Sequence, residues 1–198
     1  MKEQYGFSKN SAGVVYFNDG NNDWTQRESI ELPTNFFEEN GNANDMEGFD
    51  FNNDGYLDIV LASTTHEPYY NSRVIQFFQN EQGKNFIDVT AAISPDHAKY
   101  ADGNPYSSWW VGQGKMHIRD YDHDGDLDII DVSTRTSVFV NNGNTFELYD
   151  DFVDADEDIL LWPVEIDGDH HYDFIGSNQT CAETTCTSLL YTSPSPRD

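Results

Sequence analysis

The feature that most constrains the fold of this chain is a nine-residue acidic segment that occurs three times, at residues 50–58, 120–128 and 165–173. In each copy, carboxylate or amide side chains occupy positions 1, 3, 5 and 9, and a short apolar run follows. Such crowded oxygen-bearing groups repel one another unless a hard cation lies among them. Calcium suits this arrangement, because it takes six to eight oxygen ligands in flexible geometry. Glycine at position 6 of the first two copies (Gly55 and Gly125) permits the sharp turn that such a loop requires.

The EF-hand is the nearest alternative, because its loop opens with the same spacing. An EF-hand needs a bidentate Glu at position 12 and a helix on each side of the loop. Position 12 in this chain is Leu61, Asp131 or Gly176. The run that follows each loop is short and rich in β-branched and aromatic residues, which is typical of a buried strand. The sequence therefore favours a loop that leads into a strand over an EF-hand.

The composition is strongly acidic. The chain has 198 residues, of which 36 are acidic and 10 are basic, and its formal net charge is −26. This balance argues against nucleic acid or an anionic membrane surface as a partner. It also produces self-repulsion that bound cations would relieve. No apolar run approaches 18 residues, so we expect no transmembrane helix. The hydrophobic content of 37% is sufficient for a buried core.

A second element recurs between the acidic segments: an apolar strand, an Asn/Gly turn and another strand. It occurs at residues 14–25, 74–86 and 138–146. Asn/Gly turns between apolar runs predict β-hairpins. One repeating unit therefore contains an acidic loop, two strands joined to a third by the hairpin, and room for a fourth strand. Four short antiparallel strands in each repeat predict a β-propeller blade.

These units predict an all-β chain of about three blades, which is an incomplete propeller. The expected organisation is a partial first blade at 1–48, a blade at 49–117 with a surface insertion near 93–110, a blade at 118–163 and a truncated blade at 164–198. The Ser/Pro-rich last ten residues have two interpretations, a natural linker or a non-native tail. The first blade lacks its acidic loop and the last lacks its hairpin. We therefore expect the isolated chain to associate, since blades bury their faces against neighbours.

The acidic loop that runs into a strand, with an Asn-x-Gly hairpin downstream, resembles the FG-GAP/VCBS repeat family, which is related to integrin α-chain propellers. The resemblance covers about residues 13–177. It implies a calcium-bearing β-propeller, usually of seven blades, on secreted or cell-surface proteins, with the remaining blades elsewhere in the full-length protein. Two departures concern the third loop, which begins with Glu165 and has His170 where the family has glycine.

Two to three calcium sites are predicted from these loops, with ligands at positions 1, 3, 5, 7 and 9. The predicted ligands are Asp50, Asn52, Asp54, Tyr56 and Asp58; Asp120, Asp122, Asp124, Asp126 and Asp128; and Glu165, Asp167, Asp169, His171 and Asp173. We expect the second loop, with four Asp at positions 1, 3, 5 and 9, to bind most tightly.

The predicted function is a calcium-stabilised module that recognises a protein or carbohydrate ligand outside the cell, in adhesion or ligand recognition. No nucleophile elbow, P-loop or H-E-x-x-H motif is present in the sequence, and no catalytic residues are predicted. The main alternative is the propeller domain of a carbohydrate-active enzyme, a polysaccharide lyase or hydrolase, with Tyr106, Trp109 and Trp110 stacking on sugar rings. A calcium buffer is a further alternative. The sequence leaves open whether Cys181 and Cys186 form a disulfide.

Overall fold

Apolar runs bounded by acidic loops and Asn/Gly turns form antiparallel strands in the computed structural model. The structure describes residues 10–21, 28–67, 72–95, 114–133, 136–143, 145–149, 159–169 and 171–178, without the side chains of residues 159, 160, 177 and 178. The strands are β1 (Val14–Tyr16), β2 (Ser29–Glu31), β3 (Gly41–Phe49), β4 (Asp58–Thr65), β5 (Val74–Asn80), β6 (Phe86–Asp88), β7 (Lys115–Arg119), β8 (Asp128–Val132), β9 (Thr136–Asn141), β10 (Phe146–Tyr149), β11 (Ile159–Val164) and β12 (Asp173–Asn178). Helical structure within the described residues is limited to the 3-10 turn η1 (Glu38–Asn40) and α1 (Thr90–Ile93).

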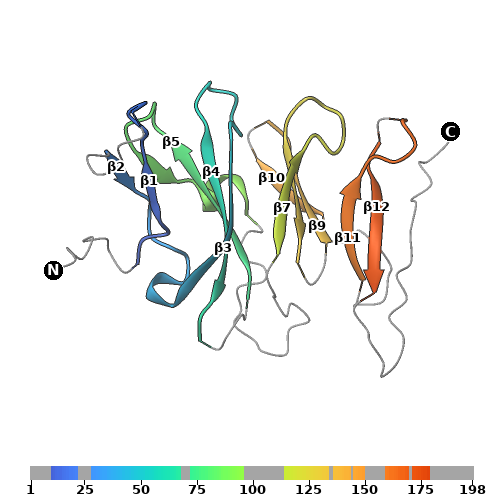
Figure 1. Ribbon diagram of the computed structural model, residues 1–198, viewed down its shortest axis with the longest axis horizontal. Coiled ribbons are helices and arrows are strands. Elements are labelled where there is room, and N and C mark those ends of the chain that lie inside the picture. The colour runs from blue at the N-terminus through green and yellow to red at the C-terminus, as the bar shows by residue number, and fades with distance from the viewer. Residues whose placement is uncertain are drawn as a thin grey trace.

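The strands form two four-stranded antiparallel sheets and two two-stranded sheets (Figure 1). The complete sheets have the orders β3-β4-β5-β6 and β7-β8-β9-β10, so each is a simple meander. The pair β1-β2 stands at one end of the row of sheets and the pair β11-β12 at the other (Figure 1). The predicted all-β fold with four-stranded antiparallel blades is confirmed, and the described strands form an incomplete propeller that does not close into a ring.

Each complete sheet begins one strand earlier in the chain than the unit expected from sequence. The expected units began at residues 49 and 118, next to the acidic loops. In the structure, β3 and β7 precede those loops and pair with β4 and β8, so the loops connect the first and second strands of a sheet. The sequence hides β3, because its nine residues carry glycine, asparagine and acidic side chains in place of an apolar run. Of the expected insertion near 93–110, residues 96–110 lie outside the described residues.

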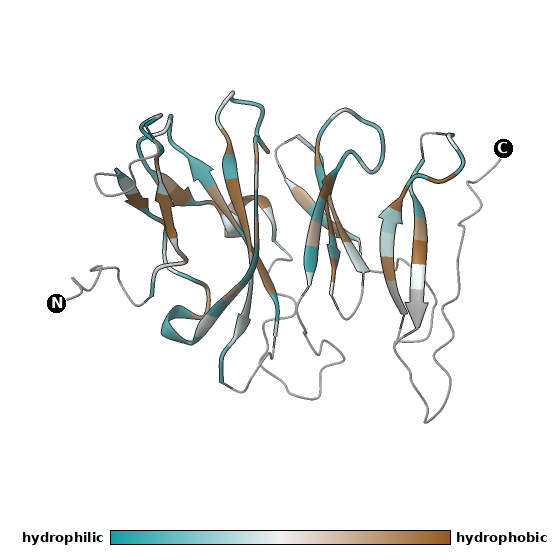
Figure 2. Cartoon of the chain, viewed as in Figure 1, coloured by the Kyte–Doolittle hydropathy of each residue, from teal (hydrophilic) through white to brown (hydrophobic). Residues whose placement is uncertain are grey.

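The central strands of the two complete sheets are buried on both faces, which explains why they read as continuous apolar runs. Successive residues of β4 point to opposite faces: Val60 faces the β7–β10 sheet, whereas Leu61 faces the β1-β2 pair. In β8, Ile129 and Ile130 alternate in the same way between the β3–β6 sheet and the β11-β12 pair. Most of the hydrophobic residues accordingly lie in the strands, whereas the connecting loops at the edges of the sheets are mainly hydrophilic (Figure 2).

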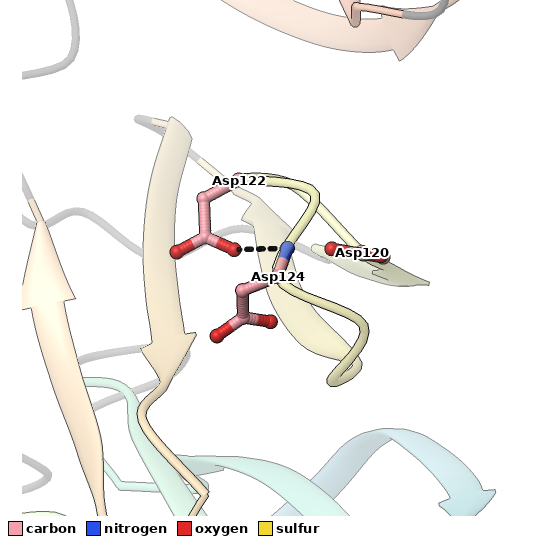
Figure 3. Close-up of side chains that lie close together, drawn as sticks. All are labelled: Asp120, Asp122 and Asp124. Atoms are coloured by element: carbon pink, nitrogen blue, oxygen red, sulfur yellow. Dashed lines mark hydrogen bonds between the residues drawn. The ribbon is translucent and has the colours of Figure 1, made fainter.

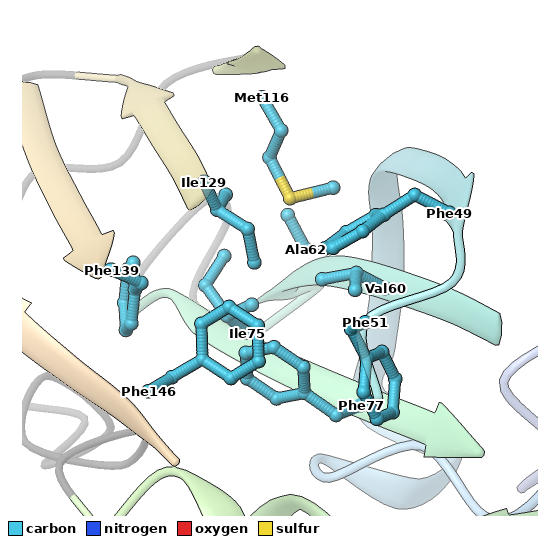
Figure 4. Packing of buried hydrophobic residues seen from close by; sticks show 10 residues of the cluster. All are labelled: Phe49, Phe51, Val60, Ala62, Ile75, Phe77, Met116, Ile129, Phe139 and Phe146. Carbon is cyan, nitrogen blue, oxygen red and sulfur yellow. The ribbon is translucent and has the colours of Figure 1, made fainter. Parts of the chain in front are cut away.

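Of the three hydrophobic cores that the described residues form, the largest lies between the two complete sheets and is rich in aromatic rings (Figure 4). Phe51 packs edge-to-face on Phe77 and on Phe146, with ring centroids 5.7 and 6.1 Å apart. Such edge-to-face pairs stabilise a core beyond the apolar area that they bury. Phe51 is position 2 of the first acidic loop, so this core anchors the loop directly.

Candidate metal centre

The three acidic loops lie at the same edge of the row of sheets, each between the first and second strands of its sheet (Figure 1). We call residues 50–58 loop 1, residues 120–128 loop 2 and residues 165–173 loop 3. Position 4 has a left-handed backbone in all three loops, with φ of 58° at Asn53, 63° at His123 and 81° at Gly168. Glycine at position 6 also has a positive φ in loops 1 and 2. In loop 3 the glycine stands at position 4. Position 6 of this loop is His170, which lies outside the described residues.

The aspartate at position 5 makes the same hydrogen bond in every loop. Its Oδ1 accepts the backbone amide of position 7. The pairs are Tyr56 with Asp54 (2.9 Å), Asp126 with Asp124 (2.8 Å) and His171 with Asp169 (2.8 Å). This turn, in which an aspartate accepts an amide two residues later, fixes the backbone at position 7. The three loops thus share one local conformation despite their different residues at positions 4 and 6.

Loop 2 gathers three carboxylates. Asp120, Asp122 and Asp124 each offer an oxygen within 4.8 Å of the other two (Figure 3). Asp120 Oδ2 accepts the amide of Gly125 (3.2 Å), whereas Asp120 Oδ1 is buried and has no hydrogen-bond partner among the described residues. A buried carboxylate oxygen without a partner is costly, and here two further carboxylates lie beside it. The donor set is made of hard oxygens, as calcium requires.

Loop 3 brings together a different set. Glu165, Asp167 and Asp173 offer oxygens within 4.8 Å of one another, so positions 1, 3 and 9 converge. Asp169, at position 5, is not part of this group. The longer side chain of Glu165 bonds back to its own loop, because its Oε1 accepts the amide of Gly168 (2.5 Å).

Loop 1 has no group of three carboxylates this close within residues 50–58: its position 3 is Asn52, and its three aspartates do not converge as those of loop 2 do. Both oxygens of Asp50 accept backbone amides, from Asp54 (3.0 Å) and from Gly55 (2.7 Å). The side-chain amide of Asn52 donates to Asp54 Oδ2 (3.2 Å). Internal hydrogen bonds therefore occupy more of the oxygen atoms here than in loop 2.

The aspartate at position 9 has a second role, which is to connect the loop to the rest of its sheet. Asp58 accepts the amides of Phe51 (3.1 Å) and Asn80 (2.8 Å), and Asp128 accepts those of Tyr121 (2.5 Å) and Asn141 (2.7 Å). Both aspartates are fully buried. Each carboxylate thus joins the start of its loop to the end of the third strand of its sheet.

Burial changes the acidity of these two aspartates. It raises the pKa of Asp58 from 3.8 to about 6, against the lowering effect of its two amide donors. Burial also raises the pKa of Asp128. A buried carboxyl group such as these takes up a proton at a higher pH than an exposed carboxyl group does.

The asparagine that ends the third strand of each complete sheet contacts the acidic loops, and the sequence reasoning missed this role. The side chain of Asn80 donates to the Leu57 carbonyl (2.9 Å), in addition to the bond from its amide to Asp58. Asn141 occupies the corresponding place, and its side chain also donates to the Phe51 carbonyl in loop 1 (3.1 Å). The signal in the sequence is the Asn and Gly of each hairpin, which are spaced as Asn80-x-x-Gly83 in one sheet and Asn141-x-Gly143 in the other; they predicted a turn but not the partner of the asparagine.

Neighbouring loops contact each other. Asn53 Nδ2 of loop 1 donates to Asp126 Oδ1 of loop 2 (2.9 Å). The rings of His123 in loop 2 and His171 in loop 3 lie edge-to-face with centroids 5.1 Å apart. Of the predicted position-7 residues, Asp126 and His171 thus bridge loops, whereas Tyr56 has an exposed side chain.

Comparison with known proteins identifies the repeat. The profile of the FG-GAP-like repeat matches residues 5–61 and again 50–130. The chain belongs to the FG-GAP-like repeat family. No curated protein and no solved structure matches the chain. Membership of the FG-GAP-like repeat family agrees with the observed sheets and identifies a module of the β-propeller type. FG-GAP-like repeats are typical of extracellular proteins. The helices among the described residues are too short to cross a membrane.

Proposed function

We propose that this chain is a calcium-binding β-propeller module that acts outside the cell in adhesion or ligand recognition, with calcium in a structural role. The observation that carries the proposal is the buried Asp120 Oδ1, which has no hydrogen-bond partner in the described part of the chain and belongs to one group with the carboxylates of Asp122 and Asp124. A cation bound there supplies the missing partner of that oxygen and cancels the repulsion among three like charges.

The chemistry of the donors favours calcium over other cations. The gathered side chains offer carboxylate oxygens, which suit calcium, magnesium and manganese better than zinc or copper. Magnesium demands near-octahedral geometry and keeps several waters, whereas calcium accepts irregular sites with more ligands. In loop 2 the calcium ligands would be Asp120, Asp122 and Asp124, and in loop 3 Glu165, Asp167 and Asp173. Loop 1 is the third candidate site, with Asp50, Asn52 and Asp54 as its ligands.

The structural role follows from the position of the loops. Each loop joins two adjacent strands, and its position-9 aspartate is already bonded to backbone amides. In loop 2, a cation bound by positions 1, 3 and 5 would fix the first half of the loop relative to Asp128, which already fixes the second half. The net charge of −26 makes such neutralisation stabilising for the whole chain.

Recognition is assigned to the loops, because fold alone does not specify a ligand and binding residues concentrate on loops of rigid scaffolds. A protein or carbohydrate outside the cell remains the proposed ligand. The aromatic residues on which the enzyme alternative depends, Tyr106, Trp109 and Trp110, lie outside the described residues. No observation on the described residues favours that alternative.

Calorimetric titration of the metal-free chain with calcium tests the proposal, together with melting curves in calcium and in chelator. We expect saturable binding and a higher melting temperature in calcium. Asp122→Asn should weaken binding, because it removes one of three gathered carboxylates. Glu147→Gln is the matched control, since Glu147 is an exposed acid on β10 whose loss changes the net charge equally. Absence of binding up to millimolar calcium, or equal effects of the two variants, would refute the calcium site.

Recognition is tested separately by probing arrays of immobilised extracellular-matrix proteins and polysaccharides with the chain, in calcium and in chelator. The proposal predicts retention on a protein or glycan that chelator abolishes. Cleavage of a polysaccharide in the same samples would instead support the carbohydrate-active enzyme.

A further inference from the structure

His117 lies on β7, where the second complete sheet meets the β11-β12 pair (Figure 1). Its neighbours Met116 and Ile118 pack in the core between the two complete sheets, so the alternation of the strand directs His117 to the opposite face. There its ring lies edge-to-face with the ring of Trp162 on β11, with centroids 5.9 Å apart. A titratable side chain therefore forms part of the contact between two sheets.

The Nε2 atom of His117 is buried and has no hydrogen-bond partner among the described residues. A neutral imidazole has one N–H group and one lone pair, whereas the protonated ring donates from both nitrogens and carries a positive charge. Protonation in this position would therefore bury a charged N–H group without water and without an acceptor from the described residues. Burying such a group is costly, so the observed arrangement suits the neutral ring.

Asp45, a buried carboxylate of β3 whose charge acts on His117, is already bonded to other donors. One of its oxygens accepts the backbone amide of Met116 (2.7 Å), and the other accepts the ammonium group of Lys115 (3.1 Å). Asp45 thus attracts a proton to the His117 ring through its charge, while both of its oxygens are engaged elsewhere.

Burial lowers the pKa of the His117 ring from its ordinary value of 6.5. Among the charged side chains that act on the ring, Arg119 and Lys115 of β7 lower this pKa further, whereas Asp45 and Glu47 of β3 raise it. On β8, Asp128 lies opposite Arg119 and accepts two backbone amides. Residues 159–164 of β11 carry no ionisable side chain, so the strand that contacts the ring supplies no charge to stabilise a protonated imidazole.

The rest of the contact between these two sheets is apolar and small. Among the described residues its core contains five buried side chains, against ten in the core between the two complete sheets. The hydroxyl group of Thr136 adds two hydrogen bonds to the backbone of Leu161, at 3.0 and 3.1 Å. None of these groups titrates near neutral pH, so His117 is the member of the contact whose charge changes there.

We propose that His117 makes the contact between the β7–β10 sheet and the β11-β12 pair sensitive to acid: the neutral ring closes the contact against Trp162, and the protonated ring opens it. In either tautomer the charged ring has a donor at Nε2, which must reach water, so the ring leaves Trp162 or β11 moves away. The open form binds the proton at the ordinary pKa and the closed form at a lower one. The closed form is therefore favoured above about pH 6.5 and loses population as the pH falls below it.

Hydrogen exchange of the 198-residue chain, followed by mass spectrometry at about pH 7.5 and 5.5, tests the proposal. After correction for the intrinsic effect of pH on exchange, protection of the β11 amides should fall in the wild type. The upper limit is about tenfold, since a histidine of ordinary pKa is protonated roughly ten to one at pH 5.5. His117→Gln should abolish the fall, because it removes the titrating ring. Asp58 and Asp128 titrate in both chains, so their contribution cancels in this comparison.

His66→Gln is the matched control, because it removes an exposed histidine that follows β4 and leaves the contact intact. NMR titration of the histidine rings gives a second measurement, which remains valid where His117→Gln fails to fold. The pKa of His117 should lie below 6.5 in the wild type. Trp162→Ala should raise it toward 6.5, since water then reaches Nε2.

Unchanged protection of β11 in the wild type would overturn the proposal, and so would a fall of equal size in His117→Gln. A fall that His66→Gln abolishes as well would also overturn it. So would a pKa of His117 above 6.5, which would show that the Trp162 ring stabilises the charged imidazole as a cation–π partner. The proposal does not depend on calcium. The measurements are made in calcium and in chelator, so a failure of the calcium site is distinguishable from a failure of the His117 contact.

Discussion

Arg73 and Asp131 form a buried ion pair that joins the two complete sheets. Arg73 precedes β5 and donates through Nε and Nη2 to both carboxylate oxygens of Asp131 on β8, at 2.6 and 2.5 Å. Both side chains are almost fully buried. The pair crosses the same interface that the aromatic core fills, so it fixes the relative position of two sheets that share no backbone hydrogen-bond ladder.

The first prediction concerns this pair. Asp131→Leu should destabilise the chain by about 3–5 kcal/mol, because it leaves the Arg73 guanidinium charged and unpaired in the interface. Arg73→Met combined with Asp131→Leu should recover most of that loss, since the two apolar side chains need no partner. Urea unfolding measures the free energies of both variants. A double variant as unstable as the single one would show that packing, not the lone charge, causes the loss.

The second prediction separates the position-9 aspartate from the other loop aspartates. Asp58→Asn should lower the free energy of unfolding by about 1–3 kcal/mol even in chelator. Two backbone N–H groups donate to the two oxygens of the Asp58 carboxylate, and in the variant one of them would face the NH2 group of the Asn side chain in place of an oxygen. Asp54→Asn in the same loop should have little effect on stability in chelator, because Asn retains the oxygen that accepts the Tyr56 amide. The bond that this variant loses, from the Asn52 side chain, is exposed to solvent. Thermal unfolding without calcium compares them. Equal losses would contradict the special role of position 9.

The third prediction concerns pH in the absence of calcium. Burial raises the pKa of Asp58 to about 6 from an ordinary 3.8, so the folded chain binds this proton more tightly than the unfolded chain. The resulting stabilisation is complete below about pH 4 and is lost as the pH rises through about 6. The free energy of unfolding of the chelated chain should therefore increase as the pH is lowered from 7 to 5.

Asp58→Asn should flatten this pH dependence, since it removes the titrating group. Calcium should reverse the trend, because its ligands must be deprotonated. Melting temperatures across the pH range provide the measurement. A chelated wild-type chain that loses stability steadily from pH 7 to pH 5 would contradict the assignment.

The fourth prediction compares loops 2 and 3. Asp124→Ala should weaken calcium binding more than Asp169→Ala, although both residues occupy position 5. Asp124 lies in the group of three carboxylates in loop 2, whereas in loop 3 the gathered residues are Glu165, Asp167 and Asp173. Calorimetric titration of the two variants gives the loss of affinity. A larger loss for Asp169→Ala would show that loop 3 rearranges on binding to use position 5.

The fold was predictable from sequence because its repeat is local. Oxygen-bearing residues at alternate positions, the following apolar run and the Asn/Gly turn all lie within a few tens of residues, and together they define a blade. What the sequence did not reveal depends on contacts between distant segments. The bond of Asp58 to Asn80, the pairing of Arg73 with Asp131 and the polar strand β3 are examples.

Within the site, the residues that gather in loop 2 were predicted, but their distribution of roles was not. A periodic pattern assigns the same role to position 9 in every loop, whereas burial and two amide donors make Asp58 and Asp128 parts of the scaffold. Loop 3 departs further, because Asp173 belongs to its carboxylate group and Asp169 does not. Sequence spacing determines which side chains are near, but hydrogen bonds with the rest of the sheet determine which oxygens point at one another.

The last prediction is that loops 1 and 2 bind calcium cooperatively through the bond between Asn53 and Asp126. Asn53 donates to the Asp126 side chain, and the amide of Asp126 donates to Asp124, a proposed ligand. Calcium in loop 2 would fix Asp126 and, through it, the turn of loop 1. One such hydrogen bond contributes about 0.5–1.5 kcal/mol, which corresponds to roughly twofold to tenfold in affinity.

A double-mutant cycle measures this coupling. Calcium affinity of loop 1 is compared between the wild type and Asn53→Ala, each with and without Asp124→Ala, which impairs loop 2. In the wild-type background, impairing loop 2 should lower the affinity of loop 1, whereas with Asn53→Ala it should not. Asn142→Ala is the control, because Asn142 is exposed in the β9–β10 hairpin and its backbone amide bonds to Thr145. If impairing loop 2 lowers the affinity of loop 1 equally with and without Asn53, the two loops communicate by another contact, and the bond between Asn141 and the Phe51 carbonyl is the one to test next.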